Sequence, residues 1–238
     1  MKIVFVAESE KDLKLIQVLE KYGIEPEVYT ISDELKEKGF KLVSHDIIET
    51  LEKIISEENP QLVVLHKEKV DPFKLIVSKP EYIKIAEKFS KTNFLFLNDD
   101  AEDIRKIGVV LDFKESDNIE DFLKSAYDFS MLFKIEPEYI FSFYEEYYEL
   151  ALLKTHTEDE AKQILNNMRE EKIELIKGKL AKALDGKPVI LKVLSGDPKK
   201  RIPLYLHENN FDIAVLSHST DGLLHYLENI EISIAIIQ

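Results

Sequence analysis

Short apolar runs alternate along this chain with longer segments in which apolar residues recur every three or four positions. The short runs are apolar throughout instead of alternating with polar residues, which is typical of strands buried on both faces of a parallel sheet. The three- and four-residue spacing predicts amphipathic helices. Strands and helices in alternation indicate an α/β fold with right-handed crossovers between parallel strands.

The predicted elements occur in the same order in two successive parts of the chain. In the first part we expect strands at 2–7, 27–31, near 40–44, 61–66 and 93–97, and helices at 9–22, 46–57 and 80–91. In the second part we expect strands at 106–112, 138–144, 188–194, 212–217 and 231–237, and helices at 118–133, 198–209 and 221–228. The shared order indicates an internal repeat.

Sequence similarity between the two parts supports this repeat and locates an insertion. The tetrapeptide IEPE at 24–27 returns at 135–138, 111 positions later, whereas the stretch 41–66 resembles 192–217, which lies 151 positions later. The second part has therefore gained 40 residues between its second and third strands, at 145–184. Most of this insertion has helical spacing, and Thr157 with Glu160 offers a capping box at the start of the helix.

Composition excludes several classes of function. The chain has no cysteine, which rules out disulfides, thiolate nucleophiles and cysteine-based metal sites. Its net charge of -14 is spread over both parts without a basic stripe, which argues against nucleic acid or an anionic membrane as partner. No apolar run is long enough to span a membrane, and the start turns acidic too soon for a signal peptide, so we expect a cytoplasmic protein.

Three stretches of the second part carry a resemblance to a known family. The first is a strand ending in Asp112, followed by a serine-bearing loop and a helix; the second is the Gly-Asp-Pro turn at 196–198 with its helix and an Asp-led strand; the third is the last strand, ISIAIIQ. In this order and spacing, 104–238 resembles a universal stress protein domain. The first part is similar to a fainter, shortened copy, so the whole chain resembles a tandem universal stress protein.

The resemblance implies two tandem doubly wound, Rossmann-like parallel-sheet domains. We place them at 1–98 and 106–238, with 99–105 as linker. The family implies dimers in which fifth strands pair antiparallel, and the partners here would be 93–97 and 232–238. That pairing would form either an intrachain pseudo-dimer or a homodimer, and it would cover two apolar strand edges that are otherwise prone to aggregation.

Some members of the family bind ATP through glycines after the fourth strand, because a side chain there would keep phosphate oxygens away from backbone N–H groups. The positions of that glycine pattern fall here on Ser217, Thr220, Ile230 and Glu231. The segment from Ser217 to the last strand is also too short for the full loop, and Asp221 adds a carboxylate beside any phosphate. We therefore expect this chain to lack the ATP motif and to need no cofactor.

If a nucleotide did bind, the resemblance places it at the carboxyl edge of the second sheet. Each candidate also has a plain structural interpretation: Asp112 as a turn carboxylate, Gly196 as a turn residue, and Ser219 or Thr220 as the cap of the next helix. The candidate cofactor-binding residues are Asp112, Phe143, Tyr144, Gly196, Ser217, Ser219, Thr220 and Gly222.

The main interpretation is a cytoplasmic stress-response binding or scaffold protein, without catalysis, that acts through dimerisation and an unidentified protein partner. One alternative is an adenine-nucleotide sensor that binds ATP in the second copy and hydrolyses it weakly. A further alternative is a metal-dependent hydrolase in which His218, His225 and Asp221 hold the metal. The wide spacing of the histidines argues against a zinc site. The absence of a G-x-S-x-G nucleophile elbow argues against a hydrolase.

Overall fold

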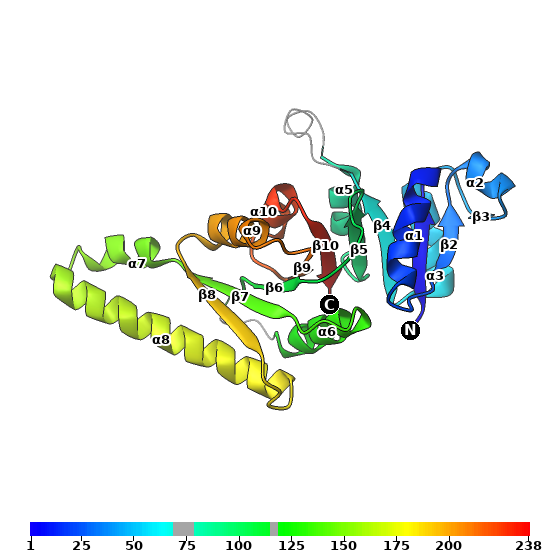
Figure 1. The fold of residues 1–238 in the computed structure, drawn as a ribbon. Helices are drawn as coiled ribbons and strands as arrows, with labels where there is room; N and C mark the ends of the chain where they lie inside the picture. Colours follow the sequence, from blue (N-terminus) through cyan, green and yellow to red (C-terminus); the bar gives the residue numbers. More distant parts are fainter. Residues whose placement is uncertain (69–78, 115–118) are drawn as a thin grey trace.

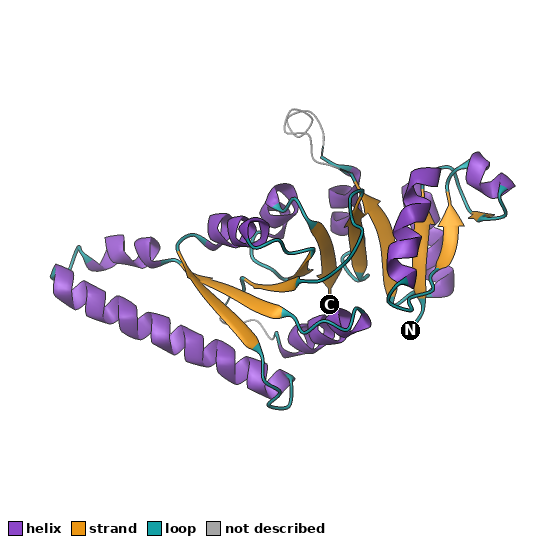
Figure 2. Ribbon diagram, viewed as in Figure 1, coloured by secondary structure: helices purple, strands orange, loops and turns teal. Residues whose placement is uncertain are grey.

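The computed structural model describes residues 1–68, 79–114 and 119–238 (Figure 1). Their strands form one ten-stranded sheet in the order β3-β2-β1-β4-β5-β10-β9-β6-β7-β8. Helices cover both of its faces (Figure 2). The α/β fold expected from the sequence is confirmed. None of the helices in these three ranges combines the length and the apolar character that a membrane crossing needs.

The described part of the first half contains the elements expected and one additional short helix, α2. In order, these are β1 (Ile3–Ala7), the 3-10 helix η1 (Glu10–Asp12), α1 (Leu13–Glu20), β2 (Glu27–Thr30), α2 (Asp33–Glu37), β3 (Lys41–Leu42), α3 (Ile47–Glu58), β4 (Leu62–Lys67), α5 (Glu81–Lys88) and β5 (Phe94–Asn98). Helix α2 was not expected, since five residues are too few to show helical periodicity. The single helix expected at 9–22 is divided into η1 and α1.

The second half repeats this order with the insertion added. Its elements are β6 (Ile107–Leu111), α6 (Glu120–Leu132), β7 (Glu138–Phe143), α7 (Glu145–Leu152), α8 (Glu158–Ala183), β8 (Ile190–Ser195), α9 (Pro198–Glu208), β9 (Ile213–Ser217), α10 (Leu223–Asn229) and β10 (Ser233–Ile237). The expected start of α6 at residue 118 and the serine-bearing loop before it lie outside the described residues. The insertion forms two helices where one was expected to dominate.

The direction of the strands divides this single sheet into two related halves. Every described strand pairing is parallel except β5 with β10, which pair antiparallel through Phe94–Ile236, Leu95–Ala235 and Phe96–Ile234. On either side of this seam the strand order is the same, counted from the seam outward. The two segments expected to pair, 93–97 and 232–238, therefore meet within one chain. The sheet is continuous in hydrogen bonding, but it contains two tandem units; the domain limits of 1–98 and 106–238 stay predictions.

The inner strands β1, β6, β9 and β10 are almost entirely apolar because both faces of the sheet are covered. On β1, Phe5 packs into the cluster with α1 and α6, whereas Val4 and Val6 pack into the cluster with α3, α5, α9 and α10. All five residues of β1, β6, β9 and β10 are buried. At about 25 cal/mol per Å² of apolar surface, this double burial is the main stabilising contribution to the fold.

Side chains from the first half also cap the last helix of the second half. Lys67, at the end of β4, is 2% exposed. Its Nζ donates hydrogen bonds of 2.7 Å to the carbonyl oxygens of Ile230 and Ile232. The Tyr82 hydroxyl donates a 2.6 Å bond to the carbonyl oxygen of Leu227. The carbonyls of Leu227 and Ile230 lie at the carboxyl end of α10, where a helix leaves acceptors unpaired and where positive charge is favourable. The carbonyl of Ile232 lies just before β10.

Candidate functional site

The second-half site lies where β6 and β9 end side by side. Asp112 follows β6, Ser217 ends β9, and the turn at 218–221 leads into α10. The two segments are joined by a 2.8 Å hydrogen bond from the Asp221 amide to the Asp112 carbonyl oxygen. Open α/β sheets place ligands at this carboxyl edge, beside the first strand. The structure therefore brings Asp112 together with the loop Ser217–Gly222, as expected.

The hydroxyl groups of this loop bond to the loop itself. Ser217 Oγ and Ser219 Oγ are 2.9 Å apart, and the Ser219 amide donates to Ser217 Oγ at 3.1 Å. Thr220 Oγ1 accepts a 3.0 Å bond from the Ser217 amide. The Thr220 amide in turn donates to the Ser217 carbonyl oxygen at 3.1 Å. The loop is thus folded tightly on Ser217, which is how a turn without glycine satisfies its polar groups.

The interpretation of Ser219 or Thr220 as a helix cap is wrong. The N-cap of α10 is Gly222, in the left-handed conformation with φ 67°, and no side chain caps the helix. The physical reason is that the Thr220 hydroxyl already accepts a hydrogen bond from the Ser217 amide, and Thr220 lies two positions before the N-cap. Gly222 is needed here because a positive φ strains residues that carry a Cβ.

Asp112 is held by a tyrosine that was not among the candidates expected from the sequence. The Tyr226 hydroxyl, from α10, donates a 2.7 Å hydrogen bond to Asp112 Oδ2. Burial raises the pKa of Asp112; the Tyr226 bond and the charge of Lys199 oppose this rise, while Asp221 and Asp197 add to it. Burial and the same carboxylate raise the pKa of Tyr226. The sequence signal for this contact was the hydroxyl group of Tyr226, because a tyrosine that is buried on a short helix usually finds a hydrogen-bond partner.

We expect Tyr226→Phe to lower the free energy of unfolding by about 1–2 kcal/mol at neutral pH, because it leaves a partly buried carboxylate without its donor. Urea unfolding would measure the change. Tyr147→Phe is the matched control, since Tyr147 is 69% exposed, and it should change stability by less than about 0.5 kcal/mol. Equal effects of the two substitutions would mean that the Asp112 bond contributes nothing.

Lys199 covers the start of α10. Its Nζ donates a 3.2 Å hydrogen bond to Asp221 Oδ2. A Cβ built on Gly222 would lie 2.6 Å from Lys199 Cε and 2.9 Å from its Nζ. The lysine side chain therefore lies directly against the backbone that a phosphate would have to approach. Lys199 was not expected as a site residue, although a lysine immediately after the Gly-Asp-Pro turn was visible in the sequence.

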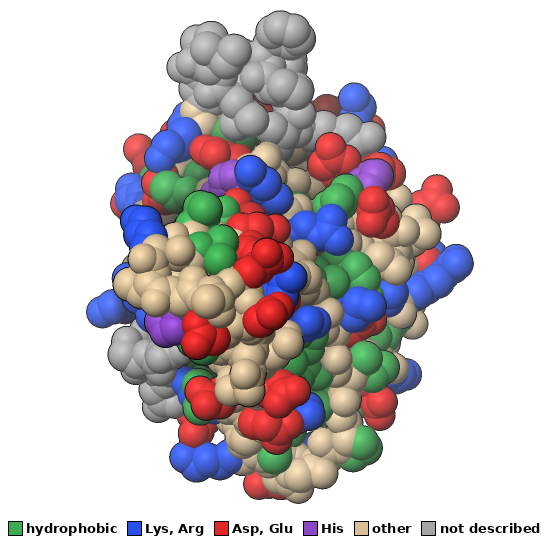
Figure 3. All heavy atoms as spheres, turned by 90° about the vertical axis from the view of Figure 1, so that its left-hand side faces the viewer, with side chains coloured by type: hydrophobic (Ala, Val, Ile, Leu, Met, Phe, Trp, Pro, Cys, Tyr) green, Lys and Arg blue, Asp and Glu red, His purple; other side chains and the backbone are tan. Residues whose placement is uncertain are grey.

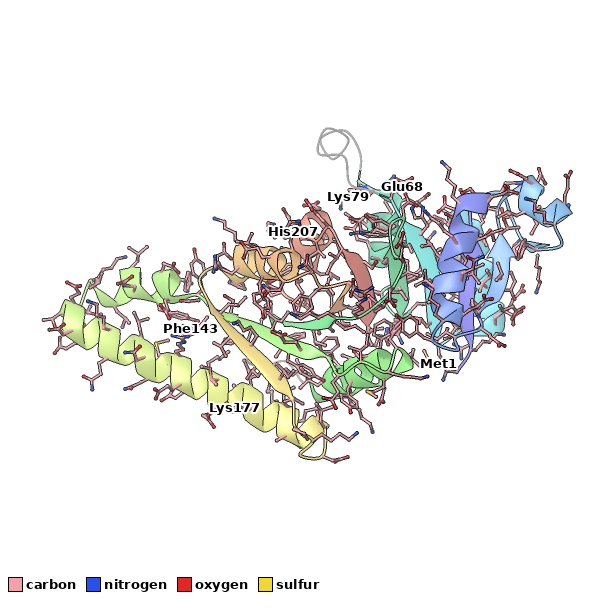
Figure 4. All side chains as sticks on the ribbon, in the orientation of Figure 1. Met1, Glu68, Lys79, Phe143, Lys177 and His207 are labelled. Carbon is pink, nitrogen blue, oxygen red and sulfur yellow. The ribbon has the colours of Figure 1, made fainter. Side chains whose placement is uncertain are left out.

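The remaining candidates form a second group around the end of β7. The Gly196 amide donates a 2.9 Å bond to the Phe143 carbonyl oxygen, and Gly196 has a φ of 109°. The Phe143 ring is buried and stacks on Tyr148 of α7 with centroids 5.6 Å apart. Tyr144 is the N-cap of α7, and its ring contacts Tyr147. These rings thus pack with the insertion, which begins at residue 145, close to Phe143 (Figure 4).

The two histidines beside the loop bind separate carbonyl oxygens. His218 Nε2 is 3.1 Å from the Thr92 oxygen, and His225 Nε2 is 3.2 Å from the Lys199 oxygen. Burial lowers the pKa of His218, against the hydrogen bond to Thr92. Within the described ranges no three His, Cys, Asp or Glu side chains are placed to hold a metal ion. The structure does not bring His218, His225 and Asp221 together as the hydrolase alternative requires.

The corresponding edge of the first half is acidic. Burial, followed by the charges of Glu81, Asp12 and Glu68, raises the pKa of Glu8 to about 7. Asp12 is 2% exposed, and its Oδ2 accepts bonds from the amides of Glu8 and Ser9 at 2.8 and 2.9 Å. His66 Nε2 lies 2.8 Å from Asp99 Oδ1, in an alignment too poor for a hydrogen bond. So many carboxylates would repel a phosphate group.

Comparison with known proteins shows the fold. No family model and no curated protein matches this sequence. Among solved structures, a functionally unknown protein from Pseudomonas aeruginosa PAO1 matches with a TM-score of 0.66 at 14% identity over 99% of this chain and 91% of that one. A protein from P. aeruginosa UCBPP-PA14, provisionally assigned as a universal stress protein, gives 0.65 at 14% identity with the same coverage.

A universal stress protein from Archaeoglobus fulgidus matches with a TM-score of 0.58 at 16% identity, over 100% of this chain and 98% of that one. These likenesses extend over the whole chain, including both halves of the sheet. The chain therefore has the tandem fold of universal stress protein structures. At this level of identity the likeness carries the fold alone.

Proposed function

We propose that this chain, whose fold is that of the universal stress proteins, is a cytoplasmic stress-response binding or scaffold protein that does not hold ATP. The observation that supports this most is the state of the loop after β9: the amides of Ser219, Thr220 and Asp221 already have acceptors, and Lys199 covers Gly222. In this proposal the chain has no catalytic activity and acts through contacts with a protein partner.

Phosphate binding at a helix start requires backbone N–H groups that point at the ligand. Here the amides of Ser219, Thr220 and Asp221 donate to Ser217 Oγ, the Ser217 carbonyl oxygen and the Asp112 carbonyl oxygen. A triphosphate would have to break these bonds and displace Lys199. It would also approach the carboxylates of Asp112 and Asp221, and this repulsion grows where water is excluded.

One observation favours the nucleotide sensor as a second candidate. The Lys199 ammonium lies beside the loop, and lysine is a common ligand of phosphate groups. If this side chain left Asp221 and turned outward, it would supply one cation to a bound phosphate. The same residue then distinguishes the two candidates.

A thermal shift assay with about 1 mM ATP and magnesium tests the proposal. We expect no change in Tm. A ligand at about 100 times its Kd would add about 2.7 kcal/mol of stability, which corresponds to roughly 5–10 °C for a chain of this size. A rise of that kind in the wild type, abolished in Lys199→Met, would establish the sensor instead.

The oligomeric state is part of the same proposal. The β5–β10 seam uses, within one chain, the strand edges through which a homodimer of this type would pair. β5 lies between β4 and β10, and β10 lies between β9 and β5. We therefore propose an intrachain pseudo-dimer.

A further inference from the structure

The insertion carries an unusual concentration of exposed apolar side chains. Helix α7 has no buried residue. Of the eleven large apolar side chains that are prominently exposed in the described ranges, five fall within ten consecutive positions: Tyr144 37%, Tyr147 69%, Tyr148 37%, Leu150 71% and Leu153 45%. Single exposed apolar residues need no explanation, but a contiguous group of them marks an interaction site. We call these five residues the α7 patch.

Contacts with β7 and α8 hold the α7 patch in place. Tyr148 stacks on Phe143, whose ring belongs to the core of the second half. Arg169 of α8 donates a 3.4 Å bond to Glu145 Oε1. The Thr157 and Glu160 capping box fixes the start of α8. The apolar side chains are therefore presented on a base with defined contacts and are not part of a loose loop (Figure 4).

Acidic residues surround the α7 patch. Between positions 144 and 160 the sequence has six acidic residues and one lysine, a net charge of -5. Two of the six, Glu145 and Glu158, are paired with Arg169 and Lys162 of α8, which leaves -3 once these partners are counted. Glu146 and Asp159 are exposed, as are the rings of Tyr144 and Tyr147. Figure 3 looks onto this end of the molecule, where Asp and Glu side chains gather next to apolar ones. An apolar centre with a charged rim is the usual anatomy of a protein interface.

The size and charge of the α7 patch determine its occupant. Since an aromatic side chain has about 150–250 Å² of surface, the exposed parts of this patch amount to a few hundred Å². A stable dimer needs about 800 Å² from each partner. In a twofold contact a second copy would also place one acidic segment against another. Anionic membranes and nucleic acids are repelled in the same way.

We propose that the α7 patch binds a short, basic amphipathic helix of a partner protein, with leucine-like anchors on one face and Lys or Arg beside them. The apolar face would cover Tyr147, Leu150 and Leu153, and the basic residues would face the acidic rim. This inference rests on the proposed function, because it names the surface through which a binding protein of this kind would act.

The test is a fluorescence anisotropy titration of the full chain with two labelled peptides at about 150 mM KCl, near physiological ionic strength. Both peptides are idealised helices of about 18 residues, or five turns, with the same leucine positions; one has Lys and the other Glu at the polar positions. We expect the Lys peptide to bind and the Glu peptide not to bind. The double substitution Leu150→Ser with Leu153→Ser should weaken binding of the Lys peptide at least about tenfold.

The control is Leu204→Ser with Leu224→Ser, which removes two exposed leucines from other helices without changing the net charge. It should leave binding unchanged, and circular dichroism should show both variants folded. If the wild type and the α7 variant bind the Lys peptide equally, binding is a general attraction of a basic peptide to an acidic protein, and the proposal is overturned. It is also overturned if the wild type does not bind the Lys peptide up to about 100 µM.

Two further outcomes would assign the surface differently. A dimer in sedimentation velocity that dissociates in the α7 variant would identify a second copy as the occupant. Binding of the wild type to lipid vesicles, lost in the same variant, would identify a membrane surface. Both overturn this inference. The ATP assay reports on a separate loop, the one after β9. If the Lys peptide does not bind and ATP does not change the Tm, the proposed function stands and only the binding role of the α7 patch is refuted.

Discussion

Replacing Lys67 by alanine is expected to lower the free energy of unfolding by about 3–5 kcal/mol at pH 9. The substitution leaves the carbonyl oxygens of Ile230 and Ile232 without a donor, at about 1–3 kcal/mol for each buried group. It also removes an aliphatic stem from the junction between the two halves, where the side chain is 2% exposed, and leaves a cavity. Denaturant unfolding followed by circular dichroism would measure the loss.

The effect of Lys67 should also depend on pH. Burial lowers its pKa from 10.5 to about 7, against the charges of Glu231 and Asp100. Because the unfolded chain binds this proton more tightly than the folded one, the contribution of Lys67 to stability is full above about pH 10.5 and is lost as the pH falls towards 7. The difference between wild type and Lys67→Ala should therefore be larger at pH 9 than at pH 7.

Lys53→Ala is the matched control, because Lys53 is an exposed lysine on α3. It should change stability by less than about 0.5 kcal/mol. If the free energy of unfolding of Lys67→Ala remained within about 1 kcal/mol of the wild-type value, the two hydrogen bonds of the Lys67 side chain would not be what couples β4 to the end of α10.

The second large effect is a stabilisation. Glu8→Gln is expected to raise the free energy of unfolding at pH 8 by about 1–3 kcal/mol. The pKa of Glu8 is raised from 4.5 to about 7, above all by burial and then by three neighbouring carboxylates. A carboxyl whose folded pKa is raised contributes stability that is present below its unfolded pKa and is lost as the pH rises through the folded value. Each tenfold difference in proton affinity between the folded and unfolded chain corresponds to about 1.4 kcal/mol.

Glutamine is neutral at every pH, so the gain from Glu8→Gln should disappear near pH 4.5. Unfolding free energies measured between that pH and pH 8 would trace its onset. Glu57→Gln, at an exposed position on α3, removes the same charge and should show no such dependence. A gain of equal size in Glu57→Gln would attribute the effect to the overall charge of -14 and not to the site around Glu8.

The two halves share a strand order but differ at their edges. The first half has a partly buried acid cluster around Glu8 and a five-residue helix between β2 and β3. The second half has a self-bonded loop covered by Lys199 and, between β7 and β8, a 40-residue insertion. The described part of the first edge is acidic, and the amides of Ser219, Thr220 and Asp221 at the second edge are already paired. The larger difference is the insertion. This contrast is why we place partner binding on α7.

Much of this architecture follows from local sequence. Short runs rich in apolar residues identified all ten strands that the structure describes, and the repeated segments at two different spacings located the insertion at 145–184. The Thr157 and Glu160 box marked the start of α8 correctly. These features are readable because periodicity and capping depend on residues only a few positions apart. The pairing of 93–97 with 232–238 was expected from the family resemblance and not from periodicity.

Tertiary structure alone decided the contacts that determine the chemistry of the site. Lys199 meets Gly222 23 residues later, Tyr226 meets Asp112 across 114 positions, and Lys67 reaches Ile230 across 163. No local pattern encodes such meetings, because they depend on which strands lie side by side and how the helices cross them. The sequence by itself determined where strands, helices and the insertion lie; the packed sheet decided which polar groups are satisfied, and that satisfaction governs whether a ligand can be held.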